Sequence, residues 1–460
     1  MSMPSDRQNS EYPSAKYGWY VVVVLTLAYT VSFIDRQIIA LMVEPIRRDL
    51  EITDTQISLL LGLAFAVFYT ILGIPIARLA DRFNRRRIIM VGITIWCLMT
   101  ASCGIARNYV QLFIARVGVG VGEAALSPSA LSMISDYFPQ AVRARAVAFY
   151  TMGISLGVGL AMIIGGKVIT VVQNAPNVVL PVVGELYAWQ TVFIVVGLPG
   201  LVIAALMITV KEPKRKERYR VSDSGASDRD DLSLSTAMQF FGTRWKMYAS
   251  HFFGMSTVGI LSYGFYAWIP TMFIRTWNWS ILDIGLAYGT VTLIAGPSAV
   301  FLASWLTERL MARGHNDAHM RAALYLNLLG IAGAVLTPMM PTPQLALIML
   351  LPMTAGVMAA TAAGISALMI VTPNQMRAQA SAMYYFVINL LGLTAGPTGI
   401  ALFTDYVYKD DALIRYSIGS VAILAGLFAT GILMYNLRHY RRSYIESKAW
   451  SGLSETAGDS

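Results

Sequence analysis

The chain has 460 residues, of which 56% are hydrophobic and only 13% are charged, whereas an average soluble domain carries about 25% charged residues. A soluble enzyme could not bury that much apolar surface, so the composition excludes one and favours a membrane protein. The net charge of +9 would suit nucleic acid, but most Lys and Arg residues lie in loops between apolar segments, which argues against that partner.

The first half of the chain contains six apolar segments of about 20 residues or more, the length that crosses a bilayer. A polar tail over 1–16 precedes them. The first apolar segment is too long for a signal peptide, so we expect it to remain as an anchor. The predicted spans of this N-terminal bundle, 17–210, are 17–43, 54–79, 87–106, 108–134, 143–171 and 187–210.

A charged segment over 211–244 separates the two halves. It begins KEPKRKERYR and continues with Ser, Asp and Gly, which is typical of a flexible linker. Beyond it we expect a C-terminal bundle over 245–437 and a tail over 438–460. The predicted spans of this bundle are 246–274, 281–307, 321–340, 343–371, 377–404 and 412–437.

The distribution of Lys and Arg predicts the orientation. Both tails, the linker and the loops on the same side carry most of these residues, so the positive-inside rule places both termini and the linker in the cytoplasm. We therefore predict an all-α polytopic membrane protein with twelve transmembrane helices in two pseudo-symmetric six-helix bundles. The compact loops favour a bacterial inner membrane, and we expect a monomer.

The two halves share matching motifs. The pattern PxxxRAxAxAxY occurs at 139–150, after the fourth span, and again at 373–384, after the tenth. The segment ARLADR at 77–82 follows the second span, and SWLTER at 304–309 follows the eighth. Two matched pairs at similar offsets indicate an internal duplication, which supports two bundles of six helices.

The segment 77–82 and the arginines after it resemble the Gly-x-Leu-Ala-Asp-Arg signature of the major facilitator superfamily, with Ala77 in place of the glycine. The resemblance implies secondary transport by alternating access, in which two bundles rock around a central site. It also implies that the charges of the repeated motifs act in gating, although they could simply mark the cytoplasmic helix ends. The gating candidates are Asp81, Arg82, Arg143, Glu308, Arg309 and Arg377.

Four charged residues lie within predicted spans, where a charge at the helix centre costs about 3 kcal/mol or more. Asp35 and Arg36 belong to the first span, and Arg116 and Glu123 to the fourth. Because Arg116 and Glu123 are seven residues apart, they share one helix face. Either acid could pair with either arginine. The cluster could be purely structural, but we favour proton exchange at the two carboxyls and binding of an anionic substrate group by the two arginines.

The sequence around these charges resembles the spinster-type branch of the superfamily. The resemblance rests on IDRQ at 34–37, RVGVGVGEAALSP at 116–128 and the whole segment 62–87. It implies a proton-coupled transporter of a lipid-like or amphiphilic organic anion, such as a lysophospholipid or a sphingoid phosphate. The glycines of 116–128 do not follow a strand, so they indicate close helix packing rather than a nucleotide loop. Pro128 is expected to kink the helix.

Aromatic side chains and one amide in spans two, seven and eleven are further substrate-binding candidates. Arginines on one wall of a cavity and aromatic rings on the other would suit an amphiphile, although aromatic residues are also common in membrane helices for packing alone. The candidates are Phe65, Tyr69, Tyr263, Tyr266, Trp268, Tyr385 and Asn389.

Two alternatives remain. Branches of the superfamily that import small carboxylates such as sugar acids share the Asp-Arg pair of span one and the Gly-x-Gly-Glu-Ala stretch of span four. A channel or a non-transporting receptor is the alternative of another class, against which stand the duplicated gate motif and the short tails. No nucleophile–base pair, metal-ligand cluster or phosphate-binding loop is visible, so we expect no enzymatic activity, cofactor or metal. The expected partners are the substrate anion, protons and the bilayer.

Overall fold

The structure is a computed structural model that describes residues 12–181, 184–215, 234–373 and 376–450. Parts of the predicted tails and of the predicted linker lie outside these ranges. Twelve helical segments among the described residues are long and apolar enough to cross a membrane. The prediction of an all-α membrane protein with twelve spans is therefore confirmed.

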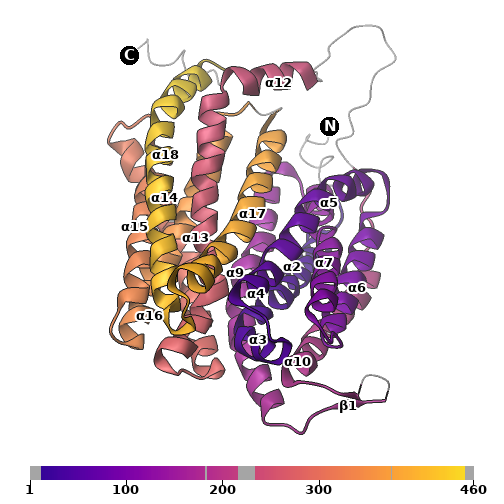
Figure 1. Cartoon of the computed structure of the whole chain (residues 1–460). Helices are drawn as coiled ribbons and strands as arrows, with labels where there is room; N and C mark the ends of the chain where they lie inside the picture. The colour runs from indigo at the N-terminus through magenta and orange to yellow at the C-terminus, as the bar shows by residue number, and fades with distance from the viewer. Residues whose placement is uncertain (1–11, 182–183, 216–233, 374–375, 451–460) are drawn as a thin grey trace. The chain divides into compact units, whose positions relative to one another are not determined.

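The chain divides into two compact units, each a bundle of long helices (Figure 1). Unit 1 comprises 1–221 and Trp279–Thr290, and unit 2 comprises 222–278 and 291–460, so that α14 (Ile281–Ala312) begins in unit 1 and continues in unit 2. The other elements of unit 1 are α2 (Ala15–Gln37), η1 (Ile38–Leu41), α3 (Val43–Leu50), α4 (Asp54–Leu61), α5 (Leu63–Arg82), α6 (Arg85–Cys103), α7 (Tyr109–Glu123), α8 (Leu126–Tyr137), α9 (Gln140–Gln173), the antiparallel pair β1 (Val179–Leu180) and β2 (Gly184–Glu185), α10 (Ala188–Gly197), α11 (Gly200–Leu206) and η2 (Met207–Thr209). The other elements of unit 2 are α12 (Leu234–Thr243), α13 (Trp245–Trp277), α15 (Ala318–Met339), α16 (Pro343–Ile370), α17 (Arg377–Leu402), η4 (Phe403–Tyr408), η5 (Asp411–Leu413) and α18 (Ile414–Trp450).

Three of the predicted spans are divided between two α-helices, one of them 187–210, which divides at Leu198 and Pro199 between α10 and α11. The span 54–79 divides at Gly62, between α4 and α5, and the span 108–134 divides after Glu123, between α7 and α8. Pro128 lies in the first turn of α8 and has no N–H to donate to the carbonyl four residues earlier. The helix is therefore interrupted close to where the sequence predicts a kink, and Glu123 is the last residue of α7.

Glycine residues bring α7 unusually close to α5 and α6. A Cβ atom at Gly122 would lie 2.6 Å from the backbone nitrogen of Trp96, and one at Gly120 would lie 2.7 Å from the carbonyl oxygen of Phe65. Both distances are shorter than van der Waals contact, so only glycine permits this packing. The close approach places α7 against α5, which carries the aromatic candidates of unit 1.

The repeated PxxxR motif makes the same contact in both units. Arg143 Nε donates to the carbonyl oxygen of Phe138 at 3.5 Å, and Arg377 Nε donates to that of Thr372 at 3.1 Å. In each case the acceptor is the residue directly before the proline of the motif. The internal duplication is thus visible in local structure, with each arginine satisfying a carbonyl near the end of the preceding helix.

Helical segments occur where the sequence predicts a linker and a tail. Helix α12 lies within 211–244, and α18 continues past 437 as far as Trp450. Arg244, directly before α13, donates to Glu446 of α18 through Nε at 3.1 Å and Nη2 at 2.9 Å. This ion pair joins the start of α13 to the extension of α18, so the predicted linker and tail are partly folded.

Asp317, directly before α15, is the acidic centre of another cluster in unit 2. Arg321 Nη2 lies 3.0 Å from the Asp317 carboxylate, and Arg441 Nε lies 2.6 Å from it. Burial disfavours the charged carboxylate, but the two arginines outweigh that effect and hold the pKa of Asp317 below its ordinary value. The cluster therefore ties α15 to α18 most strongly when Asp317 is ionised.

We expect Asp317→Asn to lower the unfolding temperature at neutral pH. A carboxyl with a lowered pKa contributes stability above its ordinary pKa of about 4, and that contribution disappears as the pH falls through the lower, folded-state value. The difference between variant and parent should thus shrink on acidification, measured by thermal unfolding across a pH series. Glu51→Gln, at an exposed position, is the control, and a difference that stayed constant with pH would contradict the assignment.

Candidate functional site

The four intramembrane charges predicted from the sequence form one buried cluster in unit 1. Asp35 and Arg36 lie near the end of α2, and Arg116 and Glu123 lie on α7. Their exposed fractions are 0% for Asp35, 7% for Arg36, 0% for Arg116 and 2% for Glu123. Burial of this kind is sustained only where charges are paired or protonated.

The structure resolves the pairing that the sequence leaves open, because Arg36 binds Glu123. Arg36 Nη2 lies 2.5 Å from Glu123 Oε2. The Arg36 guanidinium also lies over three aromatic rings, 4.1 Å from the centroid of Phe65, 4.6 Å from that of Phe33 and 5.2 Å from that of Tyr69. Arg36 is thus held between a carboxylate and an aromatic wall, an environment that suits a planar cation.

The aromatic wall is itself ordered. Phe65 and Tyr69, one turn apart on α5, stack with ring centroids 5.1 Å apart and an interplanar angle of 22°. Phe65 is fully buried. The two rings therefore present one continuous surface to Arg36.

Arg116 contacts backbone atoms rather than a carboxylate. Its Nε donates to the carbonyl oxygen of Leu60, and its Nη1 donates to that of Asp35, both at 3.4 Å. These bonds join α7 to the end of α4 and to α2. Zero exposure and backbone partners suit a residue that positions the cluster.

The Asp35 carboxyl has an unusual environment. Both of its oxygens are buried without a hydrogen-bond partner among the described residues. Trp96 and Thr100 of α6 lie beside it, yet Trp96 Nε1 and Thr100 Oγ1 are also buried without a partner. A buried carboxyl that makes no hydrogen bond in this conformation is costly when it is ionised.

The candidates in unit 2 have different surroundings from one another. Tyr263 of α13 donates through its hydroxyl to Asn389 Oδ1 of α17 at 3.1 Å. Trp268 is fully buried and donates through Nε1 to the carbonyl oxygen of Pro397 at 2.9 Å, so it is committed to packing α13 against α17. Tyr266 is half-buried, and Tyr385 is 48% exposed.

The gating candidates lie at helix ends. Arg82 closes α5 and is exposed, as are Glu308 and Arg309 on α14; the side chain of Asp81 lies outside the described part of the chain. Arg309 lies over the ring of Trp305 at 5.6 Å.

The sequence analysis did not single out two arginines that make several contacts near the end of α5 in unit 1. Arg85 is 1% exposed and binds Asp136 at 2.5 Å and Glu212 at 2.8 Å. Arg215 Nη2 donates to the carbonyl oxygens of Ala80 and Phe83, both at 2.7 Å. The start of the predicted linker therefore contacts the end of α5, which carries the gate motif. In the sequence, only the closeness of basic residues to that motif indicated such a contact.

A comparison with family models matches residues 25–397 to the Major Facilitator Superfamily. The chain belongs to this superfamily. An MFS-type efflux pump of Mycolicibacterium smegmatis is 25% identical over 97% of this chain and 99% of the pump. A probable L-galactonate transporter of Escherichia coli is 24% identical over 64% of this chain and 62% of that protein. Protein spinster of Drosophila melanogaster is 25% identical over 64% of this chain and 46% of spinster.

A solved structure supports the same fold. A bacterial homolog of the human lysosomal transporter Spinster, in an inward-facing and unoccupied conformation, superposes with a TM-score of 0.76 at 24% identity, over 95% of this chain and 99% of that one. The prediction of a spinster-type major facilitator transporter is therefore confirmed. The matches to spinster and to the galactonate transporter each cover less than two thirds of the relative's own length.

Proposed function

We propose that this major facilitator protein is a proton-coupled transporter of an amphiphilic organic anion, such as a lysophospholipid or sphingoid phosphate. The observation that carries the proposal is the position of Arg36, held between Glu123 at 2.5 Å and the rings of Phe33, Phe65 and Tyr69. An anionic head group would replace Glu123 as the partner of Arg36, and the adjacent rings would contact the apolar part.

The arrangement links substrate binding to protonation of Glu123. Arg36 cannot give its best hydrogen bonds to both Glu123 and a substrate anion, and an ionised Glu123 left without its partner would be a costly buried charge. Protonation of Glu123 removes that cost and frees Arg36. By thermodynamic linkage, substrate binding then promotes proton uptake, and a lower pH promotes substrate binding.

Asp35 serves as a second protonation site in this proposal. Its carboxyl oxygens have no hydrogen-bond partner among the described residues, so the neutral acid suits the observed conformation better than the anion. A change in the packing of α2 that brought Arg116 or water to Asp35 would favour release of the proton. The pair Asp35 and Glu123 would thereby couple protons to the movement of the bundles.

The remaining parts of the proposal follow from the orientation and the repeat. The two bundles, over 17–210 and 245–437, give the substrate alternating access to the two sides of the membrane. The protein acts as a monomer in a bacterial inner membrane. Both of its termini are cytoplasmic. The substrate-binding candidates of unit 2 are Tyr263, Tyr266, Tyr385 and Asn389. The gating residues are those that the sequence predicts at the cytoplasmic helix ends.

Sugar acids are the second candidate substrates. The probable L-galactonate transporter of Escherichia coli shares 24% identity over 64% of this chain, and a sugar carboxylate could bind Arg36 as a phosphate would. The aromatic wall around Arg36 favours the amphiphile, because a polyol offers it little apolar surface.

Substrate-dependent stabilisation followed by flux tests the proposal. Purified protein is heated with lysophospholipid or with galactonate, and each compound that raises the unfolding temperature is then tested for flux into proteoliposomes with an imposed pH gradient. We expect saturable, proton-driven flux of the lysophospholipid. If galactonate alone stabilised the protein and was transported, sugar acids would replace the amphiphile as the proposed substrate. Flux that did not depend on the pH gradient would refute proton coupling.

A further inference from the structure

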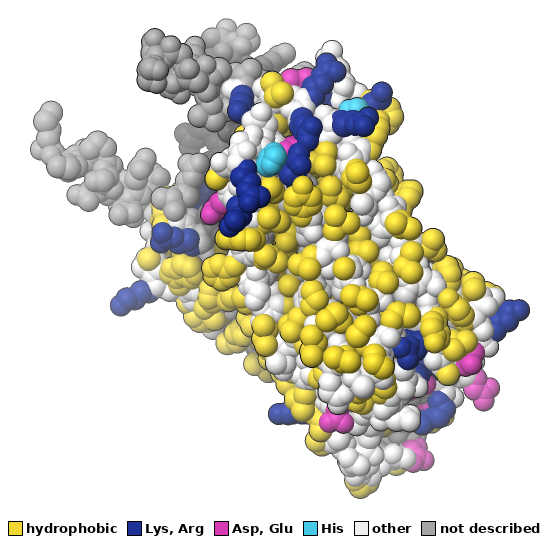
Figure 2. Space-filling model, turned by 90° about the vertical axis from the view of Figure 1, so that its left-hand side faces the viewer, with side chains coloured by type: hydrophobic (Ala, Val, Ile, Leu, Met, Phe, Trp, Pro, Cys, Tyr) yellow, Lys and Arg dark blue, Asp and Glu magenta, His cyan; other side chains and the backbone are white. Residues whose placement is uncertain are grey.

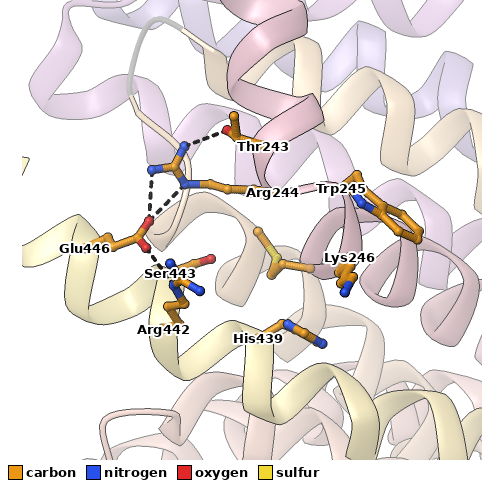
Figure 3. Close-up of a pocket in the computed structure, with 9 residues that line it drawn as sticks. Thr243, Arg244, Trp245, Lys246, His439, Arg442, Ser443 and Glu446 are labelled. Carbon is orange, nitrogen blue, oxygen red and sulfur yellow. Dashed lines mark hydrogen bonds and ion pairs between the residues drawn. The ribbon is translucent and has the colours of Figure 1, made fainter.

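A basic pocket of about 590 Å³ lies in unit 2 and is lined by none of the four intramembrane charged residues (Figure 3). Helix α18 contributes His439, Arg442, Ser443 and Glu446, and the chain around the start of α13 contributes Thr243, Arg244, Trp245, Lys246 and Met247. Among the described residues, three permanent cations thus line the pocket with a single carboxylate. Such an excess of positive charge in a concave site favours an anion.

The charges of the pocket are only partly neutralised. Glu446 accepts from Arg244 at 2.9 Å and from Arg442 at 3.2 Å, and the close-up shows these contacts on one side of the pocket. Arg244 also lies over the ring of Phe240 at 4.3 Å, which fixes its position. Lys246 forms no ion pair within the described residues and is exposed. Lys246 and the exposed face of Arg442 therefore remain open to a ligand.

The pocket lies at the ends of two candidate membrane spans. Trp245 is the first residue of the span Trp245–Trp277, and the pocket residues of α18 lie in the last turns of Asp411–Lys448. Trp245 is 61% exposed, and an exposed tryptophan at a span end is typical of the boundary between lipid and water. The distribution of Lys and Arg predicts that this boundary is the cytoplasmic one.

Exposed apolar side chains lie on the same two helices, closer to the middle of each span than the pocket residues. Phe253 of α13 is 52% exposed, and Met434 and Tyr435 of α18 are 57% and 49% exposed. Figure 2 shows a broad hydrophobic face with Lys, Arg and His side chains gathered at one end of it. A ligand in the pocket could therefore place a charged group among the cations and acyl chains on the apolar surface.

We propose that this pocket binds the phosphate-bearing head group of an anionic bilayer lipid. Basic pockets between transmembrane helices on the cytoplasmic side suit such head groups, and each Lys or Arg near the surface strengthens the attraction. A bound lipid would bridge Arg244 and Lys246 at the start of α13 to Arg442 on α18. The lipid would thereby hold together the two helices that the Arg244–Glu446 ion pair already joins.

Binding of defined lipids to the full-length protein tests this inference. Detergent-solubilised protein is titrated with phosphatidylglycerol or phosphatidylcholine of identical acyl chains, and bound lipid is counted by native mass spectrometry. We expect the preference for phosphatidylglycerol to fall roughly 30-fold in the double variant Lys246→Gln, Arg442→Gln. The matched control is Lys16→Gln, Arg78→Gln, which removes one exposed Lys and one exposed Arg from unit 1 and should keep the preference.

Two results would overturn the proposal. An unchanged lipid preference in the Lys246→Gln, Arg442→Gln variant would mean that anionic lipid binds elsewhere. Binding of glycerol 1-phosphate as tight as that of phosphatidylglycerol would identify the pocket as a site for a soluble phosphate instead. Because Lys246 and Arg442 are both exposed, we expect the variant to fold, which its unfolding temperature would verify.

Discussion

Glu123→Gln is expected to abolish proton-driven accumulation of substrate while leaving exchange of substrate across the membrane intact. The amide imitates the protonated carboxyl in shape and charge, so it frees Arg36 for the substrate at every pH. Exchange requires only that loaded protein reorient, whereas accumulation requires Glu123 to release its proton on one side. The measurements are gradient-driven uptake and counterflow in the same proteoliposomes.

The pH dependence of binding supplies a second result for the same variant. In the parent protein, substrate affinity should rise as the pH falls, by at most about tenfold per pH unit for one linked proton. In Glu123→Gln that dependence should be flat, at the high affinity of the protonated form. Asp35→Asn serves as the comparison, since it removes the other carboxyl of the cluster. A Glu123→Gln protein with unchanged accumulation and unchanged pH dependence would show that Glu123 is not the coupling group.

The twelve spans were predictable because the signal for each one is local. Runs of about 20 apolar residues cross a bilayer whatever their neighbours do, and Pro128 marks the break between α7 and α8 through its missing N–H. The repeated PxxxR motif predicted equivalent structure in the two halves, and Arg143 and Arg377 indeed make equivalent contacts.

The partners within the charge cluster were less predictable because they depend on how helices rotate against one another. Asp35 and Arg36 point about 100° apart on α2, so the rotation of α2 about its own axis decides which of them meets Glu123. Nothing in the third span marks Trp96 and Thr100 as neighbours of Asp35. Their position follows from the packing of Gly122 on the backbone at Trp96, where a Cβ would lie only 2.6 Å away.

At two other sites, contacts with neighbouring helices gave a residue a different role from the one that its type or its segment predicts. Trp268 has the residue type of a ligand-binding aromatic, yet its indole is buried and bonded to Pro397. Arg215 lies in a segment whose charge predicts a flexible linker, but its guanidinium docks on the end of α5. In both cases an available hydrogen-bond acceptor on a neighbouring helix decided the outcome, and acceptor positions cannot be inferred from one segment alone.

Arg36→Gln is expected to lose substrate binding by about 2–5 kcal/mol, or roughly 30-fold to several-thousand-fold, which is the usual effect of truncating one partner of a buried charge pair. The loss should appear in the dissociation constant measured by substrate-dependent thermal shift or calorimetry. Arg78→Gln, an exposed arginine on α5, is the control for the change of residue type. It should bind as the parent does.

The double variant Arg36→Gln, Glu123→Gln separates a substrate-binding role from a purely structural ion pair. Arg36→Gln alone leaves Glu123 without the partner seen at 2.5 Å, so it should also lower stability, and neutralising Glu123 should recover most of that loss. If the pair only holds α2 against α7, transport should recover together with stability. If Arg36 binds the substrate anion, the stabilised double variant should still fail to bind or transport it. Recovery of stability without recovery of binding is therefore the result that assigns Arg36 to the substrate.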